Sequence, residues 1–312
     1  MRSILAWHRP LMVVGLVCAA AVPLGVLGTL VDPREVLGAP VWLKPTKFAA
    51  SIAIFCVTWA WLYDQLRLRR GRARGASVAG TVAAVALAVE IVVIAVQAGR
   101  GTTSHFNTTS RLDASLWATM GSSIVLAWLA TLWIAAGLFA VRDLEPARRV
   151  AIRAGAVLAL VGMALGFLMT TPTPDQLADF RGVTGAHTVG LTDGGPGLPL
   201  VGWSTVGGDL RVPHFVGMHA LQLLPLVLIV VEAAAGRVAL LADPRVRRDL
   251  MVAAAGGYTG VLALLTWQAL RGQPLLAPDA PTVAVAGALA VLVVAAGVVA
   301  LRGRRPALTP GR

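Results

Sequence analysis

The chain has 312 residues, of which 57% are hydrophobic and only 13% charged, and its mean hydropathy is +0.75. Soluble domains carry about a quarter charged residues, so this composition excludes an ordinary water-soluble globule. A transmembrane β-barrel is excluded as well, because its strands would show shorter segments of alternating polarity. The net charge of +12 does not indicate a nucleic-acid partner. The basic residues lie in short segments between apolar runs, where lipid headgroups are the better explanation.

Apolar runs of about 20 residues, the length that a helix needs to cross a bilayer, recur along the chain. They predict an all-α integral membrane protein, a single transmembrane domain over residues 1–312 with a bundle of about eight helices. The expected spans are, in chain order, 11–31, 46–63, 77–98, 115–140, 151–171, 213–235, 250–270 and 280–301. The segment 172–212 is expected to form a compact loop cap over the outer mouth of the bundle.

The charges of the connecting segments predict the orientation. Alternate segments, beginning with the N-terminus, hold 19 basic and five acidic residues, whereas the other set holds eight of each. By the positive-inside rule, this difference places both termini in the cytoplasm. Because 25 of the 27 basic residues are arginines, the chain is typical of a GC-rich bacterial genome. The expected location is therefore a bacterial inner or plasma membrane, with the lipid bilayer as the first partner.

Two features of the first spans have alternative interpretations. The N-terminal apolar stretch could be a secretory signal peptide, but it runs to Val31, longer than such a region usually is, which favours a retained span. Cys18 and Cys56 both lie inside apolar runs and form no CxxC pair. We interpret them as small core residues and not as a disulfide or a metal site.

The first cluster of polar residues surrounds the outer end of the third span. Glu90 lies within that span, where a carboxylate costs about 2.5 kcal/mol or more. Gln97 lies two helical turns further along and shares its face. The pair predicts either a tie between helices or a proton or ligand site, with His219 or Lys47 as the expected partner of Glu90 from another span. The following polar segment adds four candidates: Arg100, His105, Asn107 and Asp113.

The second cluster belongs to the expected cap. Loops of that length are usually functional or disordered, and the mixture of apolar and turn residues with little charge argues against disorder. The cap would present His187, Asp193, Trp203 and Asp209. None of its glycine patterns is followed by the Lys-Ser/Thr of a phosphate loop, so a nucleotide ligand is not expected.

The third cluster opens the sixth span. His214 and His219 are five residues apart, so they point about 140° away from each other on a helix and cannot ligate one metal ion as a pair. His219 and Gln222 share a face. The only two lysines of the chain, Lys44 and Lys47, begin the second span. They indicate either snorkelling at the interface or a need for a compact ammonium group.

Four segments carry a family resemblance: KPTKFAASIA, QAGRGTTSHFN, GAHTVGLTDGGPGLP and LRVPHFVGMHALQ. They resemble parts of a bacterial family of multi-pass membrane proteins that has no assigned activity. The resemblance covers the outer half of the second, third and sixth spans and their loops. It implies a membrane location and brings no activity with it.

Three functional hypotheses follow from these clusters. The first is a metal-dependent membrane enzyme acting on a small molecule or lipid, in which Glu90 and His219 are catalytic and His105 and His219 face one outer cavity. Its transition metal or ligand would be held by His105, Asp113, Asp209 and His214. The remaining candidates would support the site: Lys44, Lys47, Gln97, Arg100, Asn107, His187, Asp193, Trp203 and Gln222.

The second hypothesis is an electron-transfer protein with a haem b between two histidines, or one linked to a quinone. The third is a carrier or sensor, in which an outer pocket binds a small ligand and Glu90 couples binding to protons. Against a carrier, the two halves of the sequence show no repeat. The sequence leaves the cofactor, the ligand and the oligomeric state open.

Overall fold

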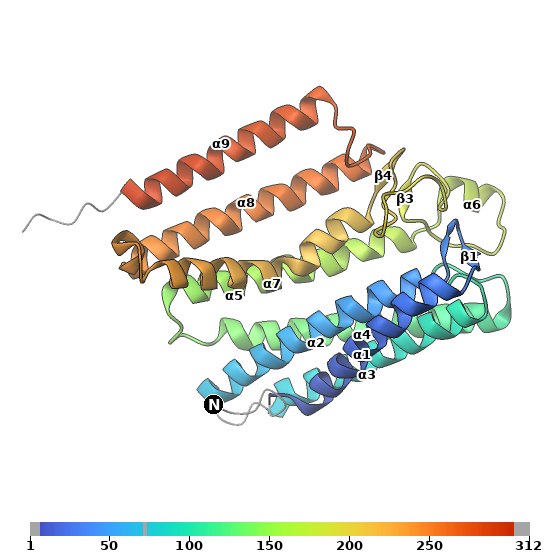
Figure 1. Cartoon of the computed structure of the whole chain (residues 1–312), viewed down its shortest axis with the longest axis horizontal. Coiled ribbons are helices and arrows are strands. Elements are labelled where there is room, and N and C mark those ends of the chain that lie inside the picture. Colours follow the sequence, from blue (N-terminus) through green and yellow to red (C-terminus); the bar gives the residue numbers. More distant parts are fainter. Residues whose placement is uncertain (1–6, 71–73, 303–312) are drawn as a thin grey trace, which may run out of the picture.

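The computed structural model describes residues 7–70 and 74–302, and eight of the helices in these ranges are long and apolar enough to cross a membrane (Figure 1). The predicted all-α architecture, with eight helices of membrane-spanning length and polarity, is thereby confirmed. The helices are α1 (Arg9–Val31), α2 (Leu43–Arg70), α3 (Arg74–Gly99), α4 (Arg111–Phe139), α5 (Pro146–Leu165), α7 (Arg211–Ala234), α8 (Pro244–Leu270) and α9 (Ala280–Arg302).

Several helices begin earlier than their apolar runs, because hydropathy does not detect a polar first turn. In α5, the side chain of Glu145 accepts a hydrogen bond from the backbone N–H of Arg148, and Pro146 occupies the first helical position. In α8, Asp243 and Pro244 play the same roles. An acceptor side chain before a helix and a proline at its start are both strong helix-initiating features.

The bundle consists of two groups of four helices, which Figure 1 shows as a lower and an upper layer. In the first half, α1 packs on α2 and α3 packs on α4, and in the second half α5 lies against α7 while α9 lies along α8. The halves meet mainly where α5 follows α4, and there the indole Nε1 of Trp128 donates to the carbonyl oxygen of Leu160 (3.1 Å). Cys18 and Cys56 are buried in the core of the first half, as predicted.

The tightest helix contact is the crossing of α5 and α7. A Cβ placed on Gly162 would lie 2.3 Å from the backbone carbon of Gly217 and 2.3 Å from the backbone nitrogen of Met218. Backbones can approach this closely only where side chains are absent, as is common between helices in membranes. The two glycines therefore determine how α7, with its histidines, is placed against α5.

The connecting segments at one end of the bundle form a cap of short elements. A hairpin of β1 (Glu35–Val36) and β2 (Ala39–Pro40) joins α1 to α2. The segment after α5 contains a 3-10 turn, η2 (Gly166–Thr170), the short helix α6 (Pro174–Ala178), and the antiparallel pair β3 (Thr188–Val189) and β4 (Gly208–Asp209). We refer to the end that carries this cap as the outer end. At the opposite end, η3 (Ala239–Ala242) connects α7 to α8.

The short helix α6 is not predicted from the sequence, although its start carries a recognisable pattern. Thr173 and Gln176 form a capping box, in which each side chain bonds the backbone N–H of the other residue.

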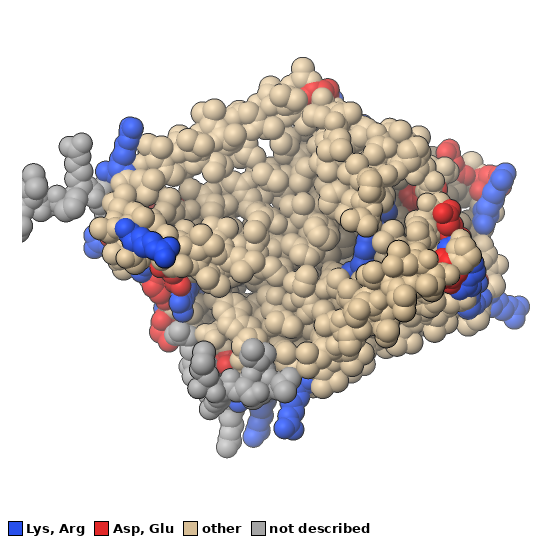
Figure 2. Space-filling view, in the orientation of Figure 1, with Lys and Arg blue, Asp and Glu red and all other residues tan. Residues whose placement is uncertain are grey.

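Charged side chains gather at the two ends of the molecule, and a belt of other residues separates them (Figure 2). Large apolar side chains in this belt are widely exposed, for example Leu226 and Ile229 on α7 and Val291 on α9. A soluble protein does not expose apolar surface on this scale. The belt is consistent with helices that lie in lipid.

Candidate functional site

Glu90 and His105 form the centre of a polar cluster at the outer end of the first half. Glu90, on α3, is only 3% exposed. One of its carboxylate oxygens, Oε1, lies 3.7 Å from Nε2 of His105. The other, Oε2, has no hydrogen-bond partner among the residues that the structure describes. A buried carboxylate oxygen without a partner is rare in folded proteins and calls for an explanation.

The predicted partner of Glu90 was wrong. The expectation was His219 or Lys47 from another span, whereas the contact comes from His105, which follows the same helix. The segment after α3 folds back over the end of the helix: Phe106 has a positive φ of 62°, and Asn107 forms a β-bridge with Val183 of the cap. This long-range bridge turns His105 towards Glu90.

Aromatic rings enclose His105. The ring centroids of Phe48, Trp117 and Phe106 lie 5.4, 5.6 and 6.0 Å from the imidazole. Its Nδ1 is 3.0 Å from the hydroxyl of Ser104. The pKa of His105 lies well below the ordinary value, first because the ring is buried, and then because the charges of Lys44, His187 and His214 disfavour a further positive charge. The neutral imidazole is therefore the form that this environment favours.

The ammonium group of Lys44 interacts electrostatically with the carboxylate of Glu90. It lies in the first turn of α2, with Nζ 6.0 Å from the centroid of the Phe48 ring. Among the described residues, its ammonium group makes no hydrogen bond, although it has three N–H donors. The half-buried Lys44 thus has unused N–H donors, and the carboxylate of Glu90 has an unused acceptor oxygen.

The cap contributes His187 to the same cluster. Its Nδ1 lies 2.5 Å from Oδ2 of Asp193, and the ring centroids of His187 and Phe106 are 4.9 Å apart. The carboxylate of Asp193 also accepts the backbone N–H groups of His187 and Thr188. Burial lowers the pKa of His187 more than the hydrogen bond to Asp193 raises it. Burial by itself would raise the pKa of Asp193. The hydrogen bonds from His187 outweigh this effect and hold the pKa of Asp193 below its usual range.

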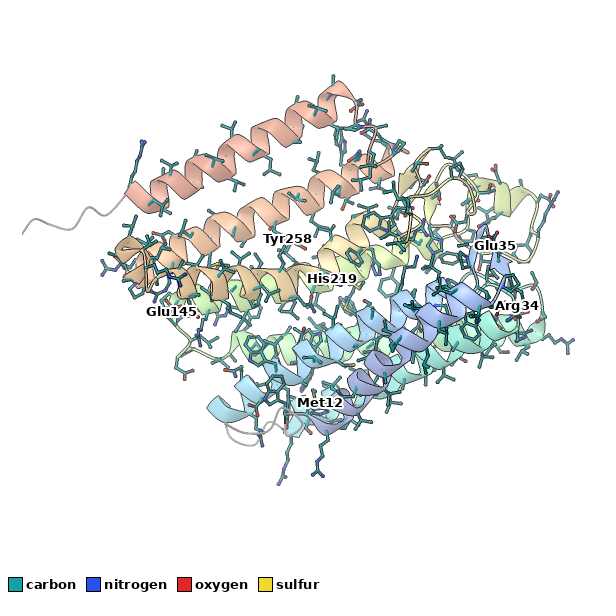
Figure 3. All side chains as sticks on the ribbon, in the orientation of Figure 1. Met12, Arg34, Glu35, Glu145, His219 and Tyr258 are labelled. Carbon is teal, nitrogen blue, oxygen red and sulfur yellow. The ribbon has the colours of Figure 1, made fainter. Side chains whose placement is uncertain are left out.

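The two histidines of α7 point in different directions, as their spacing predicts. Nδ1 of His214 is 2.7 Å from the carbonyl oxygen of Gly162 on α5. Nδ1 of His219 is 2.8 Å from the carbonyl oxygen of Phe215 in its own helix. Figure 3 shows His219 on the part of α7 that faces α2. His105 and His219 thus lie in different surroundings, and the shared cavity stays a prediction.

We use the name outer chamber for the cluster of side chains Lys44, Glu90, His105, His187 and His214, whose charges interact with one another. Two of its imidazoles have an acceptor at Nδ1. For His187 it is the carboxylate of Asp193, and for His214 it is the carbonyl oxygen of Gly162. An acceptor at one ring nitrogen keeps the proton there and leaves Nε2 as a lone-pair donor. In the described part of the chain, these Nε2 atoms have no hydrogen-bond partner. The chamber therefore combines free donor, acceptor and lone-pair groups.

Asp113, Gln97, Arg100 and Asn107 have a structural arrangement. Asp113, near the start of α4, accepts from Nε2 of Gln97 (2.9 Å) and pairs with Arg100 (2.6 Å). Gln97 and Arg100 also bond each other. Asn107 organises its own turn, because its amide oxygen accepts from the backbone and side chain of Thr109. These contacts hold the segment that carries His105.

Asp209 is likewise occupied, since Arg211 and the backbone N–H of Ser204 both bond its carboxylate. The predicted ligand set of His105, Asp113, Asp209 and His214 is therefore divided between separate networks. Within residues 7–70 and 74–302, no three His, Cys, Asp or Glu side chains come close enough together to hold a metal ion.

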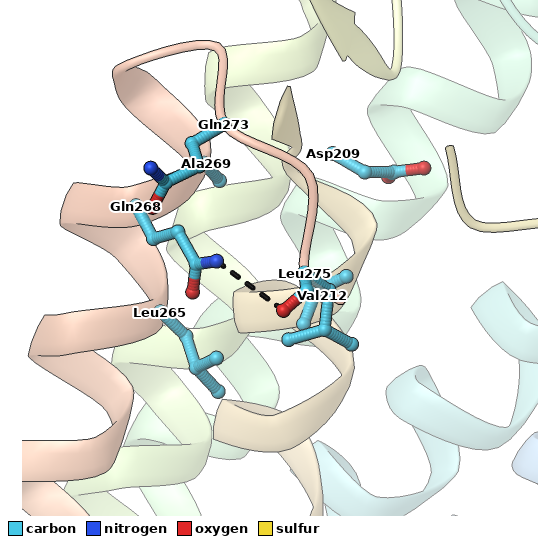
Figure 4. A pocket seen from close by; sticks show the side chains of 7 residues that line it. All are labelled: Asp209, Val212, Leu265, Gln268, Ala269, Gln273 and Leu275. Atoms are coloured by element: carbon cyan, nitrogen blue, oxygen red, sulfur yellow. Dashed lines mark hydrogen bonds between the residues drawn. The ribbon is translucent and has the colours of Figure 1, made fainter. Parts of the chain in front are cut away.

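A small pocket opens at the outer end of α8, and no residue of the chamber lines it (Figure 4). Its walls come from β4, α7, α8 and the segment before α9: Asp209, Val212, Leu265, Gln268, Ala269, Gln273 and Leu275. Gln268 closes part of it by donating to the carbonyl oxygens of Pro274 (2.8 Å) and Leu275 (3.3 Å). Its polar side chains already have hydrogen-bond partners, so we do not assign it the main site.

Several residues of the site were not found from the sequence. The aromatic wall of Phe48, Phe106 and Trp117 looks like ordinary core residues in a hydrophobic chain. Arg211 could have been found, because an Asp-Leu-Arg sequence at the start of an outer span brings a charge pair to the interface.

Comparison of the chain with known proteins finds no match among family models, curated proteins or solved structures.

Proposed function

We propose that this chain is a membrane protein that binds a small polar molecule in the outer chamber and passes a proton between Glu90 and His105. The observation that carries this proposal is the unpartnered, buried Oε2 of Glu90. Polar groups without partners in a buried position cost stability, and they persist where a ligand completes them. Lys44 supplies N–H donors beside it, so a molecule with both donor and acceptor atoms fits the chamber.

The spacing of Glu90 and His105 supports proton transfer through the bound molecule. Their 3.7 Å separation is longer than a hydrogen bond, so the two groups do not bond each other directly. A hydroxyl or a water that lies beside the pair, within hydrogen-bond distance of both atoms, could bond both, which is a geometry that permits acid–base exchange. His105, as a neutral imidazole, can accept the proton at Nε2.

The orientation of the chamber belongs to the same proposal. The excess of basic residues in the segments opposite the cap supports a chamber that faces the outside of a bacterial cell membrane. We expect a membrane-impermeant maleimide to label Arg181→Cys in intact cells, because Arg181 is exposed on the cap side. Arg237→Cys, exposed beyond the other end of α7, should react only after the membrane is opened. The reverse pattern would show the opposite orientation.

A second candidate function is supported by the anchoring of His187 and His214. Imidazoles that ligate metals usually donate their second ring N–H to a carboxylate or a carbonyl, as the acceptors at Nδ1 of these two residues allow. A haem iron needs only two such ligands. A haem absorption band in the purified protein, lost in His214→Ala, would favour this function over the first.

The main proposal can be tested without knowledge of the ligand, through thermal stability. If Glu90 is kept for function, Glu90→Gln and Glu90→Leu should raise the unfolding temperature, because each removes a buried carboxylate with an unpaired oxygen. Asp113→Asn is the matched control: Asp113 is equally buried but fully bonded, so its loss should lower the unfolding temperature. A destabilised Glu90→Leu would mean that Glu90 only ties helices together.

The ligand class can then be sought by thermal shift with small carboxylates, phosphates, amines and quinone analogues. A ligand at 100 times its dissociation constant stabilises the folded state by about 2.7 kcal/mol. We expect one class to stabilise the natural protein but neither Glu90→Gln nor Lys44→Met. A compound that stabilises all three proteins equally would bind elsewhere.

A further inference from the structure

A second feature of the outer end is a groove between α2 and α7, separate from the chamber. The two helices are joined at this level by a hydrogen bond between the side chains of Gln222 and Thr58 (3.2 Å). Above this bond, exposed apolar side chains line the groove, Ile54 on α2 and Phe215 on α7. Figure 2 shows that the face between the two halves is hollowed and that basic atoms lie in the hollow near the outer end.

The upper part of the groove is aromatic. The Trp203 ring lies 5.7 Å from the Phe215 ring, which in turn stacks on the imidazole of His219 at 4.1 Å. Tryptophan at the outer ends of spans is typical of the headgroup level of a bilayer, where its ring bridges water and hydrocarbon. This row of rings therefore leads from the headgroup level down into the apolar part of the groove.

Two cationic nitrogens converge at the mouth of the groove. Lys47 donates from Nζ to the carbonyl oxygen of Val201 (3.0 Å), and Arg211 donates from Nη2 to that of Gly202 (2.6 Å). A Cβ placed on Gly202 would lie 3.9 Å from both Nζ of Lys47 and Nη1 of Arg211. The two cations thus face one point beside a residue without a side chain.

The charges at this point do not balance. Asp209 neutralises one cation through its contacts with Nε and Nη2 of Arg211. Nη1 of Arg211 has no partner among the described residues, and the ammonium of Lys47 keeps two free N–H groups. One positive charge therefore remains in excess, directly above an apolar groove.

We propose that an anionic phospholipid of the leaflet at the outer end of the bundle binds here, with its phosphate between Lys47 and Arg211 and an acyl chain along the groove between α2 and α7. The two cations match the phosphate oxygens, and the apolar walls match the chain. The proposal goes beyond the function assigned to the chamber and does not depend on it, since neither Lys47 nor Phe215 contacts Glu90 or His105.

Lipid retention by the purified full-length protein tests this proposal. The protein is equilibrated in detergent with equal amounts of phosphatidylglycerol and phosphatidylcholine, and bound lipid is counted by native mass spectrometry. We expect phosphatidylglycerol to be enriched about five-fold, the equivalent of ~1 kcal/mol for one excess basic charge. In Lys47→Met the ratio should fall towards one. Arg181→Gln, which removes an equal charge from an exposed ion pair on the cap, should leave it unchanged.

Further variants and a competition with phosphate distinguish a lipid site from a site for a soluble anion and from a folding defect. Lys47→Gln can keep the bond to Val201, so a folded protein with lost enrichment is obtained even if Lys47→Met is unstable. Inorganic phosphate in excess should not displace the lipid, and complete displacement would identify a site for a soluble anion instead. Equal retention of the two lipids by the natural protein, or unchanged enrichment in both Lys47 variants, would overturn the proposal. Glu90→Gln should retain the lipid normally, so the lipid proposal can be contradicted without affecting the proposal for the chamber, and the reverse also holds.

Discussion

Gly162→Ala is expected to cause a large decrease in the unfolding temperature of the detergent-solubilised protein. The new Cβ would lie 2.3 Å from two backbone atoms of α7, and 2.5 Å from the Cα of Gly217. Real Cβ atoms are not found that close, so α5 and α7 would have to separate. Overpacking of a core costs about 1–3 kcal/mol, and the upper end applies because backbone atoms cannot rotate away.

At this chain length, ~3 kcal/mol corresponds to a decrease of about 5 °C in the unfolding temperature. Gly121→Ala on α4 and Gly287→Ala on α9 are the matched controls, because a Cβ at either position meets no atom within 4 Å. Alanine is the better helix former, so these two variants should be neutral or slightly more stable. If Gly162→Ala behaved like Gly121→Ala, the close crossing of α5 and α7 would be wrong, and with it the position of His214.

The stability of the natural protein is expected to fall steeply as the pH is lowered below about 6.5, the ordinary pKa of histidine. Burial holds the pKa values of His105 and His187 below that value in the folded protein, and nearby cations add to the effect at His105. Below pH 6.5 the unfolded chain therefore binds protons that the folded chain does not. Each histidine then costs up to ~1.4 kcal/mol of stability per pH unit until its folded-state pKa is reached.

Above pH 6.5 both states carry neutral imidazoles, so this contribution is constant there. His105→Phe keeps an aromatic ring among Phe48, Phe106 and Trp117 but cannot titrate. Its unfolding temperature, measured between pH 8 and pH 5, should decline less steeply than that of the natural protein. The other histidines titrate in both proteins and cancel from the comparison. Parallel pH profiles would show that His105 is protonated as easily in the folded chain as in the unfolded one.

In the chamber, groups that lack hydrogen-bond partners lie among groups whose hydrogen bonds are satisfied, and this combination is what makes the chamber important. Asp113, Asp193 and Asp209 each accept several hydrogen bonds, and their networks hold the segments that carry His105, His187 and Arg211. Glu90 and Lys44 lack such partners. This contrast between neighbouring carboxylates distinguishes groups that build the site from groups that are free to act.

The sequence by itself determined the eight spans and the end of the bundle at which the polar residues gather. Both follow from local composition, because a span must be apolar over about 20 residues and charged residues must lie outside it. The run of α9 is apolar on every side, so the sequence could not show which of its faces is buried, whereas Glu90 and Gln97 mark a buried face of α3. In lipid, outward and inward residues are similarly apolar, and the periodicity that reveals a core face in soluble helices is lost.

Only the tertiary structure decided which polar groups meet. Glu90 contacts His105, and not His219 or Lys47, because the segment after α3 is held back over the helix end by Phe106, Asn107 and Val183. His214 reaches the carbonyl of Gly162 because two glycines let α5 and α7 approach. The pairing of Lys47 with Arg211 beside Gly202 depends on the cap folding onto α2, 154 residues away in sequence. Such contacts are set by steric fit between distant segments, and local sequence patterns carry no trace of them.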